Sequence, residues 1–320
     1  MKDIAIIGTG FSAASFSYFI KKDLDFYEKS RGVGGRCSTR RVDNVGLFDH
    51  GLQYIKSQDE EFKKFLKDYC VWKGDFKIFQ NNRLIDDLGK ERIIHENGNN
   101  ALVKNLFKNK NVMLNKELKN LEKKGDNFQL TFKDDTQENY KTVIITAPFQ
   151  QAYNLTKQFT ESFFSKFDYS MQPNLTLMVA FNKSLNLNLS AISFEDDDVL
   201  GFAANENTKK KDLINKDLEL WTIQSSLKYS IKNIYEYRNN KPNLIDEMLK
   251  SFSTKLKVDI KKDNIHYSDI HGWLYAYNTN SDTAKCYWDK DLRLGVCGDW
   301  FSGGNAESAF INAKKLAKLV

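Results

Sequence analysis

The spacing of apolar residues over positions 4–28 predicts a strand, a helix and a second strand. Ile4 to Ile7 form an uninterrupted apolar run, which is typical of a short parallel strand buried on both faces. A glycine-rich turn follows, then a helix over residues 11–20 and a second strand over residues 24–28. This order is the βαβ unit from which parallel sheets with helices on their faces are built.

After Tyr54 the alternation of strands and helices becomes less regular, and the periods of the apolar residues mix. The pattern predicts helices over residues 59–69 and 101–107, a β-hairpin over 71–88 that turns at Asn81-Asn82, a small β-meander over 112–140 and a buried strand over 143–148.

The middle of the chain reads mainly as strands, and the C-terminal end returns to a strand followed by a helix. Ala306, Ala309, Phe310, Ala313, Leu316 and Ala317 recur at helical spacing, so the last helix packs on a core. The predicted elements are strands over residues 174–181, 199–204, 218–224, 269–277 and 294–300, a helix over 244–256, and the terminal helix after Asn305.

A chain of 320 residues can bury a sizeable core and form two domains. The change of pattern after Tyr54 and its reversal near the C-terminus predict that one domain is inserted into the other. We expect a discontinuous first domain formed by residues 1–55, 96–151 and 285–320, and a substrate domain formed by residues 56–95 and 152–284.

The composition limits the class of protein. The formal net charge is +6, but basic and acidic residues are interspersed. The compact basic runs Lys209–Lys211 and Lys261-Lys262 have no aromatic residues between them, so we expect solvated surface and no nucleic-acid partner. No apolar run reaches the ~18 residues that would cross a bilayer. We therefore expect no membrane partner.

The cysteine and histidine pattern gives no metal signature. The four cysteines are Cys37, Cys70, Cys286 and Cys297, without a C-x-x-C pair, and the four histidines are scattered. No metal site is therefore expected. The pattern suits a reducing compartment, and we expect a cytoplasmic location.

The turn after the first strand carries a dinucleotide fingerprint. Gly8-Thr-Gly10-Phe-Ser-Ala13 is a G-x-G-x-x-A sequence: Gly8 permits the tight turn, Gly10 lets the backbone approach a pyrophosphate, and Ala13 allows close packing of helix on sheet. The helix N-terminus offers free N–H groups to phosphate. Glu28 ends the second strand, where an acid can accept hydrogen bonds from ribose hydroxyls. The alternative, a signal peptide, is disfavoured by Asp3 and the two glycines.

A second glycine-rich segment follows the acid. Arg31, Gly32, Gly34, Gly35 and Arg36 form a basic loop in which the backbone can crowd a ligand and an arginine can pair with phosphate. A plain NAD site does not need this loop, so the pattern favours a flavin dinucleotide held over two successive loops. The alternative is a solvated basic turn.

These segments carry a resemblance. Gly8 to Tyr54 resembles the FAD-dependent oxidoreductases of the amine oxidase type, and more narrowly their bacterial renalase-like branch. In that branch E-K-S-R-G-x-G-G-R-x-S-T-R-R precedes F-D-H-G-x-Q-Y, as do Glu28–Arg41 and Phe48–Tyr54 here, with Cys37 where Met is common. The resemblance implies an α/β fold: a Rossmann-like FAD-binding domain with an inserted, mainly antiparallel β substrate domain, the amine oxidase or p-hydroxybenzoate hydroxylase-like architecture.

The rest of the chain carries the same resemblance more thinly. The segment from Leu294 through the Gly303-Gly304 pair is similar to one that lies against the flavin. Asp299 would bond the ribitol or pyrophosphate, and the last helix, capped by Asn305, would point its N-terminus at the pyrimidine. Trp221 and residues 271–276 also match family segments. Gly272 stands where the family often has a basic residue, so a phosphate contact there is in doubt.

The fingerprint and the resemblance together predict a set of contacts to non-covalently bound FAD. Arg36, rather than Arg31, is expected to touch the pyrophosphate, Leu118 to approach the adenine through its backbone, and His50 to brace the flavin loop. The predicted cofactor residues are Gly8, Gly10, Phe11, Ser12, Ala13, Glu28, Lys29, Gly35, Arg36, Asp49, His50, Gly51, Gln53, Leu118, Gly298, Asp299, Gly304, Asn305 and Ala306.

The substrate pocket is less defined, and no nucleophile with a partnered base stands out. For the aromatic candidates the alternative is a core position, and for His271 it is a structural histidine. The candidates are Gln53, Tyr54, Trp221, His271, Trp273 and Tyr275.

The resemblance implies a flavoprotein oxidoreductase that oxidises dihydro-isomers of NAD(P)H to NAD(P)+, with molecular oxygen as the acceptor and a small-molecule, dihydronicotinamide substrate. Hydride transfer to the flavin N5 from such a donor requires placement and exclusion of water, but no catalytic acid or base. Two alternatives stay open: an FAD-dependent amine oxidase or related desaturase, and an FAD-binding fold that serves as a non-catalytic interaction protein.

Overall fold

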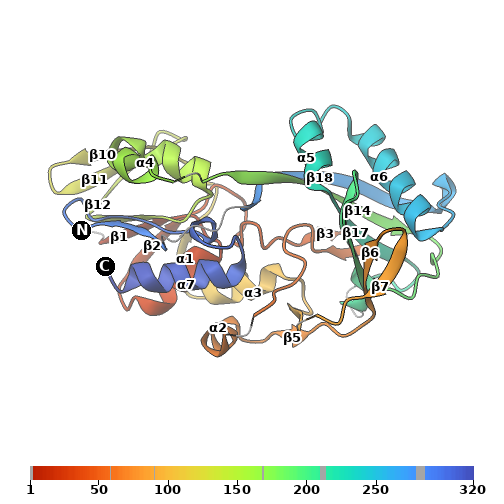
Figure 1. Cartoon of the computed structure of the whole chain (residues 1–320). Coiled ribbons are helices and arrows are strands. Elements are labelled where there is room, and N and C mark those ends of the chain that lie inside the picture. Colours follow the sequence, from red (N-terminus) through yellow and green to blue (C-terminus); the bar gives the residue numbers. More distant parts are fainter. Residues whose placement is uncertain (1–2, 58, 90, 168, 210–213, 279–284) are drawn as a thin grey trace.

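Two sheets form the body of the protein, and Figure 1 shows them toward opposite ends of an elongated molecule. The structure is a computed structural model that describes residues 3–57, 59–89, 91–167, 169–209, 214–278 and 285–320. The expectation that Lys209–Lys211 is solvated surface is wrong for Lys209, which is buried in an ion-paired position, and residues 210–211 lie outside the described residues.

The first sheet is parallel except at one edge. Ile4 to Ile7 are all buried and lie between two parallel partners, as an apolar run of this kind predicts. Within the described residues the sheet has six strands in the order β19 (Tyr287–Asp289), β20 (Leu294–Val296), β13 (Thr142–Ile145), β1 (Ile4–Ile7), β2 (Leu24–Tyr27) and β9 (Asn111–Met113), and only β19 runs antiparallel to its neighbour.

Helices and a small β-meander cover this first sheet. Helix α1 (Phe11–Phe19) packs against α7 (Ala306–Ala317), so the first and last helices of the chain lie together (Figure 1). Helix α4 (Phe149–Phe164) packs on the meander. The strands of the meander are β10 (Leu118–Lys124), β11 (Asn127–Phe132) and β12 (Gln137–Tyr140).

An aromatic cluster holds α2 (Glu60–Leu66) onto this unit. The Phe62 ring lies 5.2 Å from that of Phe310 in α7 and 6.3 Å from that of Phe11 in α1. Helix α2 therefore packs with the first sheet, although it belongs to the segment 56–95 that the sequence assigned to the substrate domain. The short elements beside it are β5 (Cys70–Val71), β8 (Ile93–Ile94), α3 (Asn100–Lys104) and the 3₁₀ turn η1 (Asn105–Phe107).

The second sheet is mainly antiparallel, and this confirms the predicted fold class. Helices α5 (Leu227–Asn233) and α6 (Lys241–Leu256) pack on one face. The described part of the chain gives it seven strands in the order β18 (Ile265–Asn278), β14 (Met171–Phe181), β17 (Glu219–Ser225), β16 (Leu200–Asn205), β15 (Ala191–Phe194), β6 (Phe76–Gln80) and β7 (Arg83–Asp86), and only β15 and β6 pair in parallel.

The long strands β14 and β18 join the two ends of the molecule (Figure 1). They pair antiparallel from Met171 opposite Asn278 to Phe181 opposite Ile265. The hairpin of β3 (Arg40–Val42) and β4 (Gly46–Phe48) packs on the second sheet through Phe48. Among the described helices, none is long and apolar enough to cross a membrane.

Candidate cofactor and substrate site

The turn between β1 and α1 has room for a ligand at Gly10. Gly8 has a φ of 104°, a left-handed value that favours glycine, and a Cβ there would lie 2.7 Å from Thr146 Oγ1. At Gly10 an added Cβ would meet nothing within 4 Å. Because the N-terminus of α1 presents backbone N–H groups at this place, the turn fits a pyrophosphate.

Glu28 lies directly after β2 and faces the same turn. Its carboxylate accepts hydrogen bonds from Thr9 N at 3.1 Å, Thr9 Oγ1 at 2.6 Å and Ser30 N at 2.9 Å. The side chain is buried with the residue 6% exposed. These donors hold the acid beside the glycine turn, where the sequence predicts a ribose contact.

The second glycine loop touches both the turn and the C-terminal segment. Gly34 N donates to Thr9 O at 2.9 Å, and a Cβ on Gly35 would lie 3.7 Å from Gly10 Cα. Arg36 forms a bidentate ion pair with Asp299, with Nη1 2.8 Å from Oδ2 and Nη2 2.5 Å from Oδ1. The segments from the two ends of the chain therefore meet at this loop.

The C-terminal segment ends in a capped helix. Asp299 begins the 3₁₀ turn η4 (Asp299–Phe301) and Gly304 follows with a φ of 63°. The Asn305 side chain accepts from Ser308 N at 2.8 Å, which makes it the N-cap of α7, as its position predicts. The first turn of α7 thus begins close to Asp299, since Gly304 N bonds to Asp299 O at 3.2 Å.

Side chains fix the loop of residues 49–53, which has no regular secondary structure. Each carbonyl of the loop accepts a side-chain hydrogen bond, so its backbone is held without a helix or a strand. The donors are Gln53 Nε2 to Asp49 O, Trp273 Nε1 to His50 O at 2.8 Å, Gln224 Nε2 to Gly51 O at 3.0 Å, and Asn99 Nδ2 to Leu52 O and to Gln53 O at 2.9 Å each.

Beneath this loop lies a buried ionic cluster. The Lys209 ammonium lies 3.8 Å from Asp49 Oδ2 and 3.5 Å from Glu206 Oε2, and all three side chains are 0% exposed. The same ammonium donates to Gln53 Oε1 at 3.0 Å, and Asp49 N donates to Glu206 Oε1 at 3.0 Å. Asp49 and Gln53 belong to the loop, whereas Glu206 and Lys209 follow β16, so the cluster joins the loop to the second sheet.

A row of side chains crosses the second sheet on the face away from α6. The pairing registers place Phe202 of β16 opposite Gln224 of β17, Gln224 opposite Thr176 of β14, and Thr176 opposite His271 of β18. Residues directly opposite each other in antiparallel strands point to the same face. We call this row, Phe202–Gln224–Thr176–His271, the substrate face.

One end of the substrate face meets the loop of residues 49–53. The His50 ring lies 5.0 Å from the His271 ring and 5.4 Å from the Trp273 ring, and His271 and Trp273 are 4.6 Å apart. The Nδ1 atom of His50 is buried without a hydrogen-bond partner in the described part of the chain. A buried polar atom without a partner is a position where a ligand can bond.

Burial keeps both imidazoles neutral. Loss of water, followed by the charges of His271 and Arg40, lowers the pKa of His50 to about 3. Burial and the Arg40 guanidinium lower the pKa of His271 to about 4, although Asp269 opposes this shift. At neutral pH the two rings therefore present uncharged hydrogen-bonding atoms.

The other pocket candidates lie at different places in the structure, and not all of them are near His271. Tyr54 reaches the far end of the substrate face, because its ring lies 5.8 Å from that of Phe202. Tyr275 is half-buried in the core beside the first sheet. Trp221 is fully buried on the opposite face of the second sheet, 5.3 Å from Phe252 in α6, so the structure does not bring it together with His271 and Trp273.

Two predicted cofactor residues lie toward the meander. Lys29 is exposed and its ammonium bonds to Gln151 Oε1 at 3.2 Å, and Leu118 is buried in the core of the meander. Cys297 is a buried free thiol directly after β20, and burial raises its pKa.

Sequence reasoning missed several residues that shape the site. Asn99, Glu206, Lys209 and Gln224 all bond to the loop of residues 49–53 or to its neighbours. Gln224 sits in a predicted strand, but the strand pattern alone does not say which face meets the loop. The other three lie in turns far along the chain, and no local pattern marks them.

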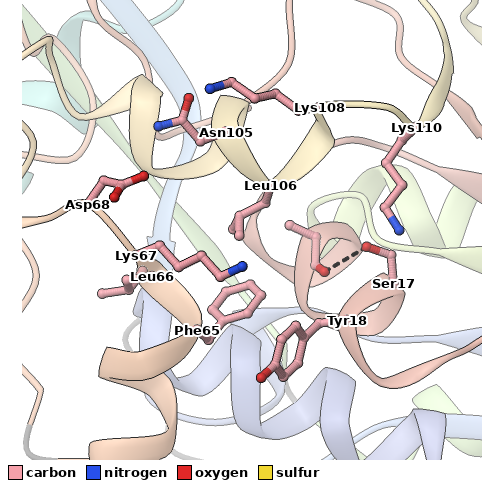
Figure 2. A pocket seen from close by; sticks show the side chains of 11 residues that line it. Ser17, Tyr18, Phe65, Leu66, Lys67, Asp68, Asn105, Leu106, Lys108 and Lys110 are labelled. Atoms are coloured by element: carbon pink, nitrogen blue, oxygen red, sulfur yellow. Dashed lines mark hydrogen bonds between the residues drawn. The ribbon is translucent and has the colours of Figure 1, made fainter.

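A separate pocket of about 320 Å³ lies where α1, the end of α2 and η1 meet. Figure 2 shows Tyr18, Phe65 and Leu106 within it, with Lys67 and Lys110 at its sides. None of the residues that line it belongs to the predicted cofactor or substrate residues. This pocket is therefore distinct from the candidate site.

Two family models match adjoining parts of the chain. Residues 6–69 match the NAD(P)-binding Rossmann-like domain, and residues 68–197 match the flavin containing amine oxidoreductase family. These matches support the assignment of the chain to the flavin amine oxidase superfamily. The superfamily match supports FAD as the cofactor and a flavin-dependent oxidoreductase as the class of enzyme.

Several solved structures share the fold at low sequence identity. A protein from Exiguobacterium sp. 255-15 described as a protoporphyrinogen oxidase has a TM-score of 0.78 at 9% identity, and the match covers 99% of this chain and 98% of that one. Reduced UDP-galactopyranose mutase has a TM-score of 0.77 at 12% identity, covering 99% and 93%. A putrescine oxidase bound to putrescine has a TM-score of 0.69 at 9% identity, covering 99% and 98%.

Proposed function

We propose that the protein is a renalase-like flavin oxidase that converts dihydro-isomers of NAD(P)H to NAD(P)+. The observation that carries the proposal is the substrate face, where Gln224 and the neutral His271 lie on either side of the buried Thr176, beside the loop of residues 49–53. Uncharged donors and acceptors in a row suit a carboxamide-bearing ring. None of these groups carries a negative charge that would pair with a protonated amine.

The chain's own residues position the donor rather than react with it. Bound FAD would supply the two-electron acceptor: the isomer loses a hydride, and with oxygen and one proton the products are NAD(P)+ and hydrogen peroxide. His50, His271 and Trp273 form one wall beside the loop, and the row of the substrate face holds the ring. Their close packing excludes water from the reacting carbon.

We also propose where the parts of FAD bind. We assign the pyrophosphate to the Gly10 turn, the ribose to Glu28 and the flavin to the region between Gly51 and the start of α7. The first domain, residues 1–55, 96–151 and 285–320, would bind FAD without a covalent bond, and oxygen in the cytoplasm would be the acceptor. The Arg36–Asp299 pair, which joins the two loops, supports this placement.

An amine oxidase or related desaturase is the second candidate, because the matched family is named for amine oxidoreductases. Such an enzyme would benefit from aromatic rings free to receive a substrate ammonium. The rings near Tyr54 already receive the protein's own cations: the Arg92 guanidinium lies 3.8 Å from the Phe76 ring centre and 5.4 Å from that of Tyr54. This arrangement favours the dihydronicotinamide substrate.

The test is an anaerobic titration of the FAD-loaded protein with 2- and 6-dihydro-NAD isomers, followed by visible absorbance. The proposal predicts that the flavin is bleached and that NAD+ is recovered in equal amount. A flavin that stays oxidised with these isomers but is reduced by a panel of amines would favour the second candidate. A protein that cannot be loaded with FAD would instead indicate a non-catalytic role.

A further inference from the structure

Arg40 lies beside the substrate face. It begins β3 and pairs with Phe48 of β4, and the Phe48 ring stacks on Tyr267 of β18 at 5.7 Å. Tyr267 lies four residues before His271 on β18. Because every second side chain of a strand points to the same face, the two side chains share one face of the sheet. The hairpin of β3 and β4 therefore carries the Arg40 guanidinium to the substrate face.

Arg40 differs from the arginines around it. In the part of the chain that the structure describes, the Arg40 side chain makes no hydrogen bond and no ion pair, although the residue is half-buried. Arg36 pairs with Asp299, and Arg41 donates to Asn97 O at 3.2 Å. A guanidinium has five N–H donors, and none of the Arg40 nitrogens is among the buried side-chain atoms without a partner, so these donors are open to solvent and can pair with an anion that a ligand supplies.

The charge around this place is positive. Asp269, the acid that faces His271, is paired with Lys241 at 2.7 Å. Arg40, Lys241 and Arg238 all act to lower the pKa of His271, and Asp269 acts against them. From the side of the loop, Arg40 lowers and Glu206 raises the pKa of His50. The unpaired positive charge on this face is thus that of Arg40, with Arg238 near it.

We propose that Arg40 binds a phosphate of the dihydronicotinamide nucleotide that the proposed function takes as its substrate. This inference rests on the proposed function. The ring would lie against Gln224 and His271, and the phosphate would meet the guanidinium. Arginine is suited to this because its planar fork pairs with two phosphate oxygens at once.

Binding of non-reducing ligands to the oxidised, FAD-loaded protein tests the assignment. Nicotinamide mononucleotide carries one phosphate and nicotinamide riboside carries none, and each is titrated while the flavin absorbance is followed. A charge-assisted hydrogen-bonded pair predicts that the mononucleotide binds about tenfold to a hundredfold more tightly. Arg40→Met should abolish this difference, and Arg40→Lys should restore part of it.

Arg41→Met is the matched control. Arg41 is the next residue in the same strand, is exposed and bonds to Asn97 on the other side of the hairpin. It should leave both affinities unchanged. If Arg40→Met weakens both ligands equally, or leaves the preference for the mononucleotide intact, the inference is overturned. It is also overturned if Arg40→Met weakens FAD itself, because Arg40 would then hold the cofactor.

A further probe separates this inference from the proposed function. If neither nicotinamide ligand binds the wild-type protein, the dihydronicotinamide assignment fails, and phenyl phosphate is titrated in its place. Phenyl phosphate binding that is lost in Arg40→Met and kept in Arg41→Met would retain Arg40 as a phosphate site for another substrate. No Arg40-dependent binding of phenyl phosphate would remove the site as well.

Discussion

At the scale of single residues, two glycines of the site have different physical tasks. A Cβ on Gly51 would lie 2.0 Å from Arg36 O and 3.3 Å from Trp273 Cζ2, so this glycine is needed by the protein itself. A Cβ on Gly10 would meet open space. The space at Gly10 is therefore open to the ligand that we propose there, whereas the absence of a side chain at Gly51 allows two loops to pack.

The two alanine variants should separate these tasks. Gly10→Ala should leave the stability of the FAD-free protein unchanged and weaken FAD by about tenfold or more, because a methyl group occupies the pyrophosphate position. Gly51→Ala should destabilise the FAD-free protein by about 1–3 kcal/mol, the usual effect of overpacking. Chemical denaturation and FAD titration measure both. Gly32→Ala, at an exposed glycine with open space, is the control.

The two neutral imidazoles predict a loss of stability in mild acid. The pKa is lowered to about 3 for His50 and to about 4 for His271, against about 6.5 in the unfolded chain. Between these values the unfolded chain binds protons that the folded chain does not, so lowering the pH favours unfolding. The stability should be full above pH ~7 and fall below pH ~6 by up to about 1.4 kcal/mol per pH unit for each imidazole.

Denaturant midpoints from pH 7 to pH 5 measure this slope. His271→Gln should make the slope shallower, since one neutral imidazole is removed, while His266→Gln at an exposed position should not change it. An unchanged slope in His271→Gln would show that this residue does not carry the pH dependence.

At the scale of elements, the site depends on an irregular loop that distant elements hold. Residues 49–53 follow β4, and Lys209 after β16 joins them to the second sheet. Taking charges out of water is unfavourable by several kcal/mol per ion, and their mutual pairing offsets this. We therefore expect a substitution in this cluster to weaken the contact between the loop of residues 49–53 and the second sheet more than the local structure of the substituted residue.

Lys209→Met should destabilise the fold by about 3–5 kcal/mol, because it removes the Lys209 ammonium from beside the buried carboxylates of Asp49 and Glu206. The double variant Glu206→Gln with Lys209→Met should recover part of that loss. Lys228→Met is the control: Lys228 pairs with Asp198 at 2.7 Å, both side chains are 78% exposed, and the loss of this pair should cost less. Equal losses in Lys209→Met and Lys228→Met would contradict the importance of the cluster.

The elements also show what the sequence can predict. The strands of the βαβ unit, the hairpin at Asn81-Asn82 and the helix α6 follow from apolar period and turn residues, which are local signals. Trp221 was a pocket candidate, yet its strand turns it to the core, because a period of two gives two faces without saying which one is buried against the helices. Lys209 and Asn99 reach the site through tertiary packing alone.

At the scale of the molecule, the first and last segments of the chain share one site. Gly35 lies against Gly10, and Arg36 next to it pairs with Asp299, just before α7. Helices α1 and α7 pack side by side below, so their N-terminal ends flank the same region (Figure 1). Such a meeting of distant segments explains why the motifs at both ends of the sequence point to one long ligand with phosphates in its middle.

Titration of the FAD-free protein with FAD, followed by flavin fluorescence, tests this central claim most directly. The account predicts saturable binding of one FAD per chain, weakened to a similar degree in Gly10→Ala at the N-terminal end and in Asp299→Ala at the C-terminal end, since both ends hold the same molecule. Binding that survives both substitutions with unchanged affinity, or no saturable binding to the folded wild-type protein, would contradict it.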